Sequence, residues 1–283
     1  MTGPLLIERH ADRVVATLNR PEKRNAIDQD MIDALHALCA ELEAQPRTLI
    51  ITGSGGVFAA GADIAQLRDR RADDARAAIN ATAFIRVNKL PMPVIAAVPG
   101  YALGGGAELA YAADIRIASP GLKIGNPETG LGIIAAAGAT WRLPEIVGGA
   151  RATELLLTGR VLGADEALSW GLISAIHDDD ELLGAAHAIA DRIAANDTLA
   201  TQHTKRALRA PRHEHPDIER ELQAELFESD EKMRRMTAFL ERPSSRSARS
   251  GTGSVAERHS SVPERPSSVP ERGAQRRDEG RAL

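Results

Sequence analysis

A run of three glycines at positions 104–106 restricts what this chain can fold into more than any other feature. Consecutive glycines weaken a helix or a strand, because glycine loses the most backbone freedom on folding. The run follows the apolar segment 94–98, which is typical of a buried strand, and precedes segment 107–112, which predicts the start of a helix. A strand, a glycine turn and a helix in that order leave free N–H groups at the helix N-terminus, where partial positive charge gathers.

Two interpretations of the glycine turn are open. Its N–H groups suit an oxyanion or a phosphate. The three glycines taken alone, however, favour a tight packing turn. The chain contains neither G-x-G-x-x-G nor G-x-x-x-x-G-K-[ST], so a dinucleotide site or a P-loop is a weak interpretation.

Two further segments could complete a site with the glycine turn. Residues 58–64 follow the apolar run 48–53 and form either an ordinary strand-to-helix loop or a second source of oxyanion-binding N–H groups. Glu108 ends the glycine segment, and Glu128 follows twenty residues later. Taken singly, each glutamate is most simply a solvated or salt-bridged side chain. Together in a water-poor pocket they would share a proton, which leaves one acid and one base.

In order and spacing, these segments resemble the crotonase superfamily, the enoyl-CoA hydratase/isomerase family, over about residues 4–242. The matching segments lie at residues 19–26, 58–64, 100–109, 127–128, 138–143, 157–159, 164–167, 171–173 and 239–242. The resemblance implies an α/β fold, a crotonase-like β-β-α spiral with a helical C-terminal region.

The resemblance also implies a role for four positions. The backbone N–H groups of Ala62 and Gly105 would hold the thioester carbonyl oxygen in an oxyanion hole. Glu108 would activate water, and Glu128 would donate a proton to the substrate α-carbon. Hydratases of the family carry both glutamates, so the pair favours an enoyl-CoA hydratase, a hydro-lyase that converts a trans-2-enoyl-CoA to a 3-hydroxyacyl-CoA. No metal or separate cofactor is expected, since coenzyme A is part of the substrate.

The substrate-binding residues that the resemblance implies are Lys23, Arg24, Ala26, Ala60, Asp63, Ile64, Gly104, Pro127, Gly132 and Ala136. The adenine and phosphates of coenzyme A would lie near residues 23–26 and the loop 60–64. Lys23 and Arg24 could pair with phosphate, or they could form a solvated basic turn. The acyl chain would run near residues 132–134 and Trp141.

One segment departs from the family pattern. Typical hydratases have Pro-Gly-Ala-Gly-Gly-Thr where residues 135–140 of this chain are Ala-Ala-Ala-Gly-Ala-Thr. At the position of Ala136 a glycine N–H often helps to place the catalytic water. Alanine keeps that N–H but does not suit a backbone with φ > 0. The change bears on efficiency and acyl-chain preference more than on reaction class.

Two other functions remain open. A Δ3-Δ2 enoyl-CoA isomerase, or another acyl-CoA enzyme of the family, would use Glu128 with Glu108 as a helper. A non-catalytic acyl-CoA-binding subunit would bind the thioester without turnover. The presence of both glutamates argues against the non-catalytic alternative.

Composition excludes several classes of protein. The net charge of −4 makes no case for nucleic-acid binding. The apolar runs are far shorter than a membrane span, and the N-terminus lacks the apolar core of a signal peptide. The single cysteine, Cys39, is expected as a buried core thiol, and the eight histidines show no metal-binding spacing. We therefore expect a cytoplasmic protein whose partner is an acyl-CoA thioester, with no nucleic acid, membrane or metal.

Short apolar runs alternate with helical patterns, which predicts a layered α/β core. The predicted strands lie near residues 5–9, 14–18, 48–52, 94–98 and 114–118. The predicted helices lie near residues 28–44, 64–69, 73–88, 107–112, 138–147, 151–157, 164–170, 181–195 and 198–209. Three parts follow: a spiral core at 1–195, a C-terminal helical region at 196–242, and a disordered tail rich in Ser, Pro and Arg at 243–283.

The C-terminal half carries three further expectations. Residues 217–242 predict one amphipathic helix, which the resemblance implies would close over the substrate region. The helices at 151–158 and 164–170 would build a homotrimer or a dimer of trimers, or else pack within the chain. The tail repeats a seven-residue pattern whose prolines exclude a helical heptad.

Overall fold

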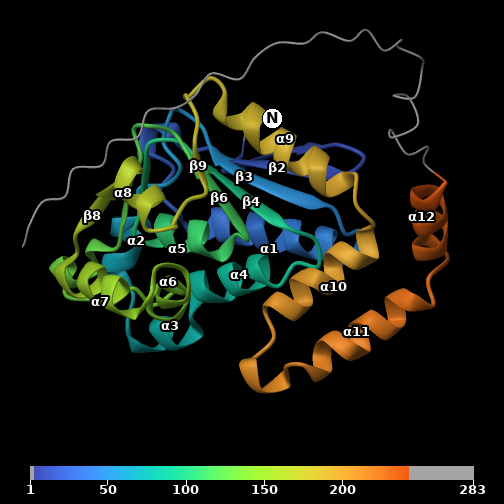
Figure 1. Ribbon diagram of the computed structural model, residues 1–283. Coiled ribbons are helices and arrows are strands. Elements are labelled where there is room, and N and C mark those ends of the chain that lie inside the picture. Colours follow the sequence, from blue (N-terminus) through green and yellow to red (C-terminus); the bar gives the residue numbers. More distant parts are fainter. Residues whose placement is uncertain (1–2, 242–283) are drawn as a thin grey trace, which may run out of the picture. The chain divides into compact units, whose positions relative to one another are not determined.

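The computed structural model describes residues 3–241, and the predicted tail at 243–283 lies outside them. Its larger sheet has six strands in the order β1-β2-β3-β4-β6-β9 (Figure 1). These strands are β1 (Leu5–Arg9), β2 (Arg13–Leu18), β3 (Thr48–Gly53), β4 (Val94–Val98), β6 (Ile115–Ala118) and β9 (Ala175–Ile176). Only the β1–β2 pair is antiparallel among the paired strands of this sheet in the described chain. The continuous apolar runs of β3 and β4 fit parallel strands that are buried on both faces.

Helices cover both faces of this sheet (Figure 1). Side chains alternate between the faces along each strand. Val14, Leu49 and Val94 pack into the cluster that contains α1 (Gln29–Ala44), α4 (Ile79–Asn88) and α5 (Gly105–Ala112). Val15, Ile50 and Ile95 pack against α9 (Leu182–Ala194) on the other face. Cys39 lies in the first cluster, as predicted, and burial raises the pKa of its thiol to about 12.

A second, three-stranded sheet stands beside the site and was not predicted. It has the order β5-β7-β8, with strands β5 (Tyr101–Leu103), β7 (Lys123–Gly125) and β8 (Val161–Gly163). Strand β5 leads directly into the glycine run, so the turn follows β5 and not β4 as the sequence indicated. Segments of three residues carry too little alternation to be predicted as strands.

The remaining helices are α2 (Ile64–Asp69), α3 (Ala72–Ala77), α6 (Ala139–Val147), α7 (Gly149–Thr158), α8 (Ala164–Ser169), α10 (Thr198–Leu208), α11 (Asp217–Phe227) and α12 (Asp230–Leu240). Short 3₁₀ turns lie at η1 (Pro21–Lys23), η2 (Pro127–Leu131) and η3 (Arg212–Glu214).

Two predicted helices are each divided in two. The helix predicted at 73–88 is wrong because Ala78 has a left-handed backbone, with φ of 52°, which ends α3 and begins α4. The single helix predicted at 217–242 is also wrong. The hydroxyl of Ser229 accepts a hydrogen bond from the N–H of Lys232 at 3.2 Å, which is the signature of a helix N-cap between α11 and α12.

By the contacts between its residues, the chain divides into two compact units. The first ends at Arg235, and the second begins at Met236. The predicted division at residue 195 stays a prediction. Within residues 3–241, no helix has both the length and the apolar character that crossing a membrane would need.

Candidate active site

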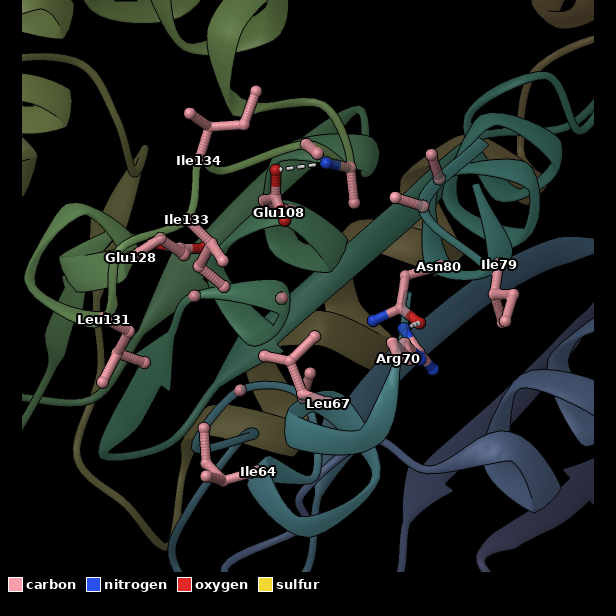
Figure 2. Close-up of a pocket in the computed structure, with 18 of the residues that line it drawn as sticks. Ile64, Leu67, Arg70, Ile79, Asn80, Glu108, Glu128, Leu131, Ile133 and Ile134 are labelled. Carbon is pink, nitrogen blue, oxygen red and sulfur yellow. Dashed lines mark hydrogen bonds between the residues drawn. The ribbon is translucent and has the colours of Figure 1, made fainter. Parts of the chain in front are cut away.

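A cavity of about 570 Å³ opens between α2, α3 and α4 on one side and η2 with the loop after it on the other (Figure 2). The N-terminus of α5 contributes Gly105 and Glu108 between these two sides. The residues that line the cavity all lie between positions 60 and 137. The predicted site residues among them are Ala60, Ala62, Ile64, Gly104, Gly105, Glu108, Pro127, Glu128 and Ala136. Residues 217–235 contribute no lining residue, and the expectation that the segment 217–242 closes over the substrate region stays a prediction.

Five predicted residues do not line the cavity. Lys23 and Arg24 are exposed on η1 and the turn after it. The carbonyl oxygen of Ala26 accepts from Arg20 at 2.5 Å. Asp63 caps α2 through the N–H of Ala65, and Gly132 ends η2 with a φ of 74°.

The turn at 23–26 nevertheless lies next to the site. The N–H of Ala60 donates to the carbonyl oxygen of Arg24 at 3.0 Å, and Ile27 pairs with Ala62 in a parallel bridge. The coenzyme-binding role of this turn therefore stays a prediction, placed at the edge of the cavity and not inside it.

Ala62 and Gly105, two residues that line the cavity, have unused backbone N–H groups and lie close together. A Cβ placed on Gly105 would lie 3.5 Å from the amide nitrogen of Ala62. Within residues 3–241, neither N–H has a hydrogen-bond acceptor. Gly105 begins α5, so its N–H has no partner inside the helix. Gly61 and Asp63, the residues on each side of Ala62, both form backbone hydrogen bonds with Ile27. These bonds hold the segment in place.

The sequence left open whether the glycine turn binds a ligand or allows tight packing. Its three glycines differ in which of the two their surroundings fit. Gly104 has a φ of 52°, and a Cβ there would lie 3.2 Å from Oε1 of Glu128. Gly106 packs against the 57–62 segment so closely that a Cβ would lie 2.3 Å from the carbonyl oxygen of Ala59. Gly104 and Gly105 thus shape the cavity, whereas Gly106 allows tight packing beneath it.

Glu108 projects from α5 into the cavity and is held by the N-terminus of α6. Its Oε1 accepts from the N–H groups of Ala137 at 2.7 Å and Ala139 at 3.1 Å. Only 3% of the residue is exposed. Burial raises the pKa of Glu108 to about 7, and the negative charge of Glu128 adds to the rise, while the two N–H donors oppose it.

Glu128 lies on η2 and faces the same cavity. Its Oε1 accepts from Nδ2 of Asn126 at 3.3 Å, and its Oε2 is buried with no hydrogen-bond partner in the described chain. Burial raises the pKa of Glu128, and the hydrogen bond from Asn126 acts in the opposite direction. The cavity therefore holds two carboxyl groups whose pKa values are both raised by burial.

Asn126 and Tyr111 were missed by the sequence analysis. The buried hydroxyl of Tyr111 donates to Oδ1 of Asn126 at 3.2 Å, which leaves the Asn126 amide group free to donate to Glu128. An asparagine immediately before the Pro-Glu pair was the available signal. Its meaning depends on the tyrosine fifteen positions earlier, which only the fold brings near.

The segment that departs from the family pattern carries no strain at Ala136. The non-glycine residues with positive φ among those described are Arg24, Asn25 and Ala78. The left-handed position of the segment is Gly138, with φ of 137°. The N–H of Ala136 has no acceptor within residues 3–241, so it stays available for a water molecule.

The residues expected along the acyl chain differ in where they lie. Ile133 and Ile134 line the cavity, but Trp141 does not. Trp141 is 43% exposed, and the guanidinium of Arg142 lies 5.2 Å from its ring centroid. The opposite wall comes from α2 to α4 and includes Leu67, which the sequence analysis did not identify.

Comparisons with known proteins agree with this geometry. A family model described as enoyl-CoA hydratase/isomerase matches residues 8–246. The short-chain-enoyl-CoA hydratase of Clostridium acetobutylicum is 36% identical over 247 residues, covering 84% of this chain and 95% of that protein. The crotonyl-CoA hydratase of Syntrophomonas wolfei is 39% identical over 249 residues, with 84% and 95% covered.

A solved structure supports the fold directly. The crystal structure of an enoyl-CoA hydratase from Bacillus anthracis aligns with a TM-score of 0.80 at 32% identity, covering 84% of this chain and 96% of that chain. The predicted crotonase-like α/β fold is thereby confirmed.

Proposed function

The chain belongs to the enoyl-CoA hydratase/isomerase family, and from this premise we propose that it is an enoyl-CoA hydratase. It adds water to a trans-2-enoyl-CoA and gives a 3-hydroxyacyl-CoA. The observation that carries the proposal is one cavity that holds two glutamates with raised pKa values beside two unused N–H groups. Hydration of a conjugated thioester needs these three elements: a stabilised oxyanion, an activated water molecule and a proton donor.

In the proposed mechanism, the thioester carbonyl oxygen accepts hydrogen bonds from Ala62 and Gly105. These donors stabilise the negative charge that forms on this oxygen when water adds to the double bond. The N-terminus of α5 adds its partial positive charge. Each donor of this kind is typically worth ~10²–10³ in rate.

The two glutamates then divide the proton transfers. Ionised Glu108 takes a proton from water as the water oxygen bonds to C3 of the substrate. Protonated Glu128 gives its proton to C2, and the electron pair of the enolate forms the new C–H bond. The hydrogen bonds from Ala137 and Ala139 favour the ionised form of Glu108, and the unpaired Oε2 of Glu128 suits a carboxyl group that carries a proton.

Turnover of crotonyl-CoA tests this function. Loss of the conjugated thioester absorbance would be followed for the wild type, Glu108→Gln and Glu128→Gln. We expect each substitution to lower kcat by at least ~10²-fold, as loss of a general acid or base does. Glu145→Gln, an exposed glutamate on α6, is the matched control and should keep wild-type turnover.

Two results would favour one of the other functions. Hydration that collapses in Glu108→Gln while Δ3-Δ2 isomerisation persists in the same variant would favour the isomerase. An acyl-CoA that binds without any turnover in the wild type would favour the non-catalytic subunit.

We extend the proposal to assembly, pathway and compartment. A homotrimer, or a dimer of trimers, is supported by apolar side chains that α7 and α8 expose, including Leu157 at 73% and Leu168 at 41%. The proposed substrate class supports a role in fatty-acid β-oxidation, and we propose a cytoplasmic location. No cofactor beyond the coenzyme A of the substrate enters the mechanism.

A further inference from the structure

The wall of the cavity formed by residues 64–81 is polar at one place where an aliphatic acyl chain would need only apolar contacts. Arg70 and Asn80 line the cavity there, beside Leu67 and Ile79. Nη1 of Arg70 donates to Oδ1 of Asn80 at 3.5 Å. Figure 2 shows these two side chains next to each other and across the view from Glu128.

Arg70 has no acidic partner in the described chain. No carboxylate oxygen of residues 3–241 lies within 4.0 Å of its guanidinium nitrogens. Neighbouring arginines are used differently: Arg68 pairs with Asp69 at 3.0 Å, and Arg76 pairs with Asp73 at 2.6 Å. Most of the five donors of Arg70 thus have no protein acceptor among residues 3–241.

The charge of this wall is positive. Its lining residues include Arg70 and Arg71 against a single acid, Asp74. Asp74 accepts the backbone N–H of Arg71 at 2.8 Å at the start of α3, and the Arg71 side chain donates to the carbonyl oxygens of Arg68 and Arg70. An anion is therefore the ligand that this wall fits, because a guanidinium binds a carboxylate or phosphate in two parallel hydrogen bonds.

The position of the pair decides between an anion on the acyl group and a phosphate of coenzyme A. A Cβ on Gly105 would lie 3.5 Å from Nδ2 of Asn80, so the pair lies beside the N–H group that receives the thioester oxygen. The turn at 23–26, where the coenzyme is expected, is instead tied to Ala60. An anion next to the thioester carbon belongs to the short acyl group.

We propose that this enzyme selects short enoyl thioesters whose acyl group ends in a carboxylate, and that Arg70, held by Asn80, binds that carboxylate. The inference rests on the proposed hydratase function for the identity of the thioester. The apolar residues Leu131, Ile133 and Ile134 line the other side of the same cavity.

Binding of unreactive thioesters tests the proposal without turnover. Calorimetry would compare glutaryl-CoA with pentanoyl-CoA, which has the same number of acyl carbons and no carboxylate. We expect the wild type to bind glutaryl-CoA about 10- to 100-fold more tightly, the range of a charge-assisted hydrogen bond. Arg70→Gln should remove this preference and leave the affinity for pentanoyl-CoA within about threefold, and Arg70→Lys should restore part of it.

A matched control shows whether the preference depends on Arg70 itself. Arg68→Gln, two residues before Arg70 on α2 but paired with Asp69 and outside the cavity, should keep the preference. Equal weakening of both thioesters in Arg70→Gln would show that Arg70 binds a phosphate of coenzyme A and would overturn the proposal. Equal wild-type affinity for the two ligands would overturn it as well. Turnover of trans-2-pentenoyl-CoA in parallel tests the hydratase function, so the two claims fail separately.

Discussion

The proposed mechanism needs Glu108 in its ionised form, although the residue is nearly inaccessible to solvent. A buried charge destabilises the folded state, so the requirement of activity opposes that of stability at this residue. Its pKa rises from the usual 4.5 to about 7 because burial disfavours the charge. Between these two values the folded state binds more protons than the unfolded state, and the free energy of unfolding therefore falls as pH rises. The full effect of the shift is about 3 kcal/mol.

Urea denaturation at pH 5 and pH 8 checks this coupling. Wild type should lose up to about 3 kcal/mol from this group over the interval, whereas Glu108→Gln should lose much less, because glutamine keeps an oxygen for Ala137 and Ala139 without a charge. If the free energy of unfolding of Glu108→Gln fell as steeply as that of the wild type, the pH dependence would arise from other groups.

Asn126 positions Glu128 and touches no reacting atom, so its substitution should separate kcat from KM. Asn126→Leu removes the donor to Oε1 and should lower kcat of crotonyl-CoA hydration about 10-fold or more, with KM nearly unchanged. The same loss raises the pKa of Glu128 further, since this hydrogen bond favours the ionised form. Glu128 acts protonated, so the alkaline limb of the pH–rate profile should move to higher pH. An unchanged limb would contradict the positioning role.

At the scale of elements, the glycine turn joins a packing requirement to a binding requirement, and two substitutions separate them. Gly106→Ala forces a Cβ to 2.3 Å from a backbone oxygen and should cost about 1–3 kcal/mol of stability. Gly105→Ala meets no atom closer than 3.5 Å, so it should fold normally. Its methyl group would occupy the place of the thioester oxygen and lower kcat/KM by ~10²-fold. Thermal melting measures the stability of both variants, and turnover measures their activity. A destabilised Gly105→Ala, or a stable Gly106→Ala that has lost its activity, would contradict the assignment.

The elements that could be predicted are those with a long apolar pattern. The runs at 48–52 and 94–98 are strands, and the pattern around Cys39 is the helix α1. The short strands β5, β7 and β8 could not be predicted, because their pairing partners come from distant segments. Ala78 could not be predicted as a helix break either, since alanine favours helices and its left-handed backbone is imposed by the surrounding structure.

The site was predictable to the extent that it depends on short motifs. Glu108, Glu128 and the two N–H groups meet in one cavity, as the resemblance implied. Arg70 and Asn80 belong to a segment without a distinctive pattern, and only the fold shows that they face the same space as Gly105. When the role of a side chain depends on a residue that is near it only in the fold, the spacing of residues along the sequence does not reveal that role.

In the whole molecule, an ion pair between buried Lys205 and half-buried Asp114 joins α10 to the start of β6. Nζ of Lys205 lies 2.8 Å from Oδ2 of Asp114 and donates to the carbonyl oxygen of Met92 at 2.9 Å. Lys205→Met should lower the free energy of unfolding by about 2 kcal/mol, because the half-buried carboxylate of Asp114 loses a charged hydrogen-bond donor, although Arg209 still pairs with it. No residue of α10 lines the cavity, so kcat should stay within about twofold of wild type. A large loss of kcat without a loss of stability would show that α10 takes part in the site.

In the proposed mechanism Glu108 and Glu128 act as one acid–base unit, and a double-mutant cycle on crotonyl-CoA hydration would show whether they do. The kcat values of wild type, Glu108→Gln, Glu128→Gln and the double variant would be compared. Each single substitution should cost at least ~10²-fold, and the double variant should be hardly slower than the slower single variant, because residues that act together are not additive. Two losses that multiply in the double variant, or a single variant with wild-type kcat, would contradict the account.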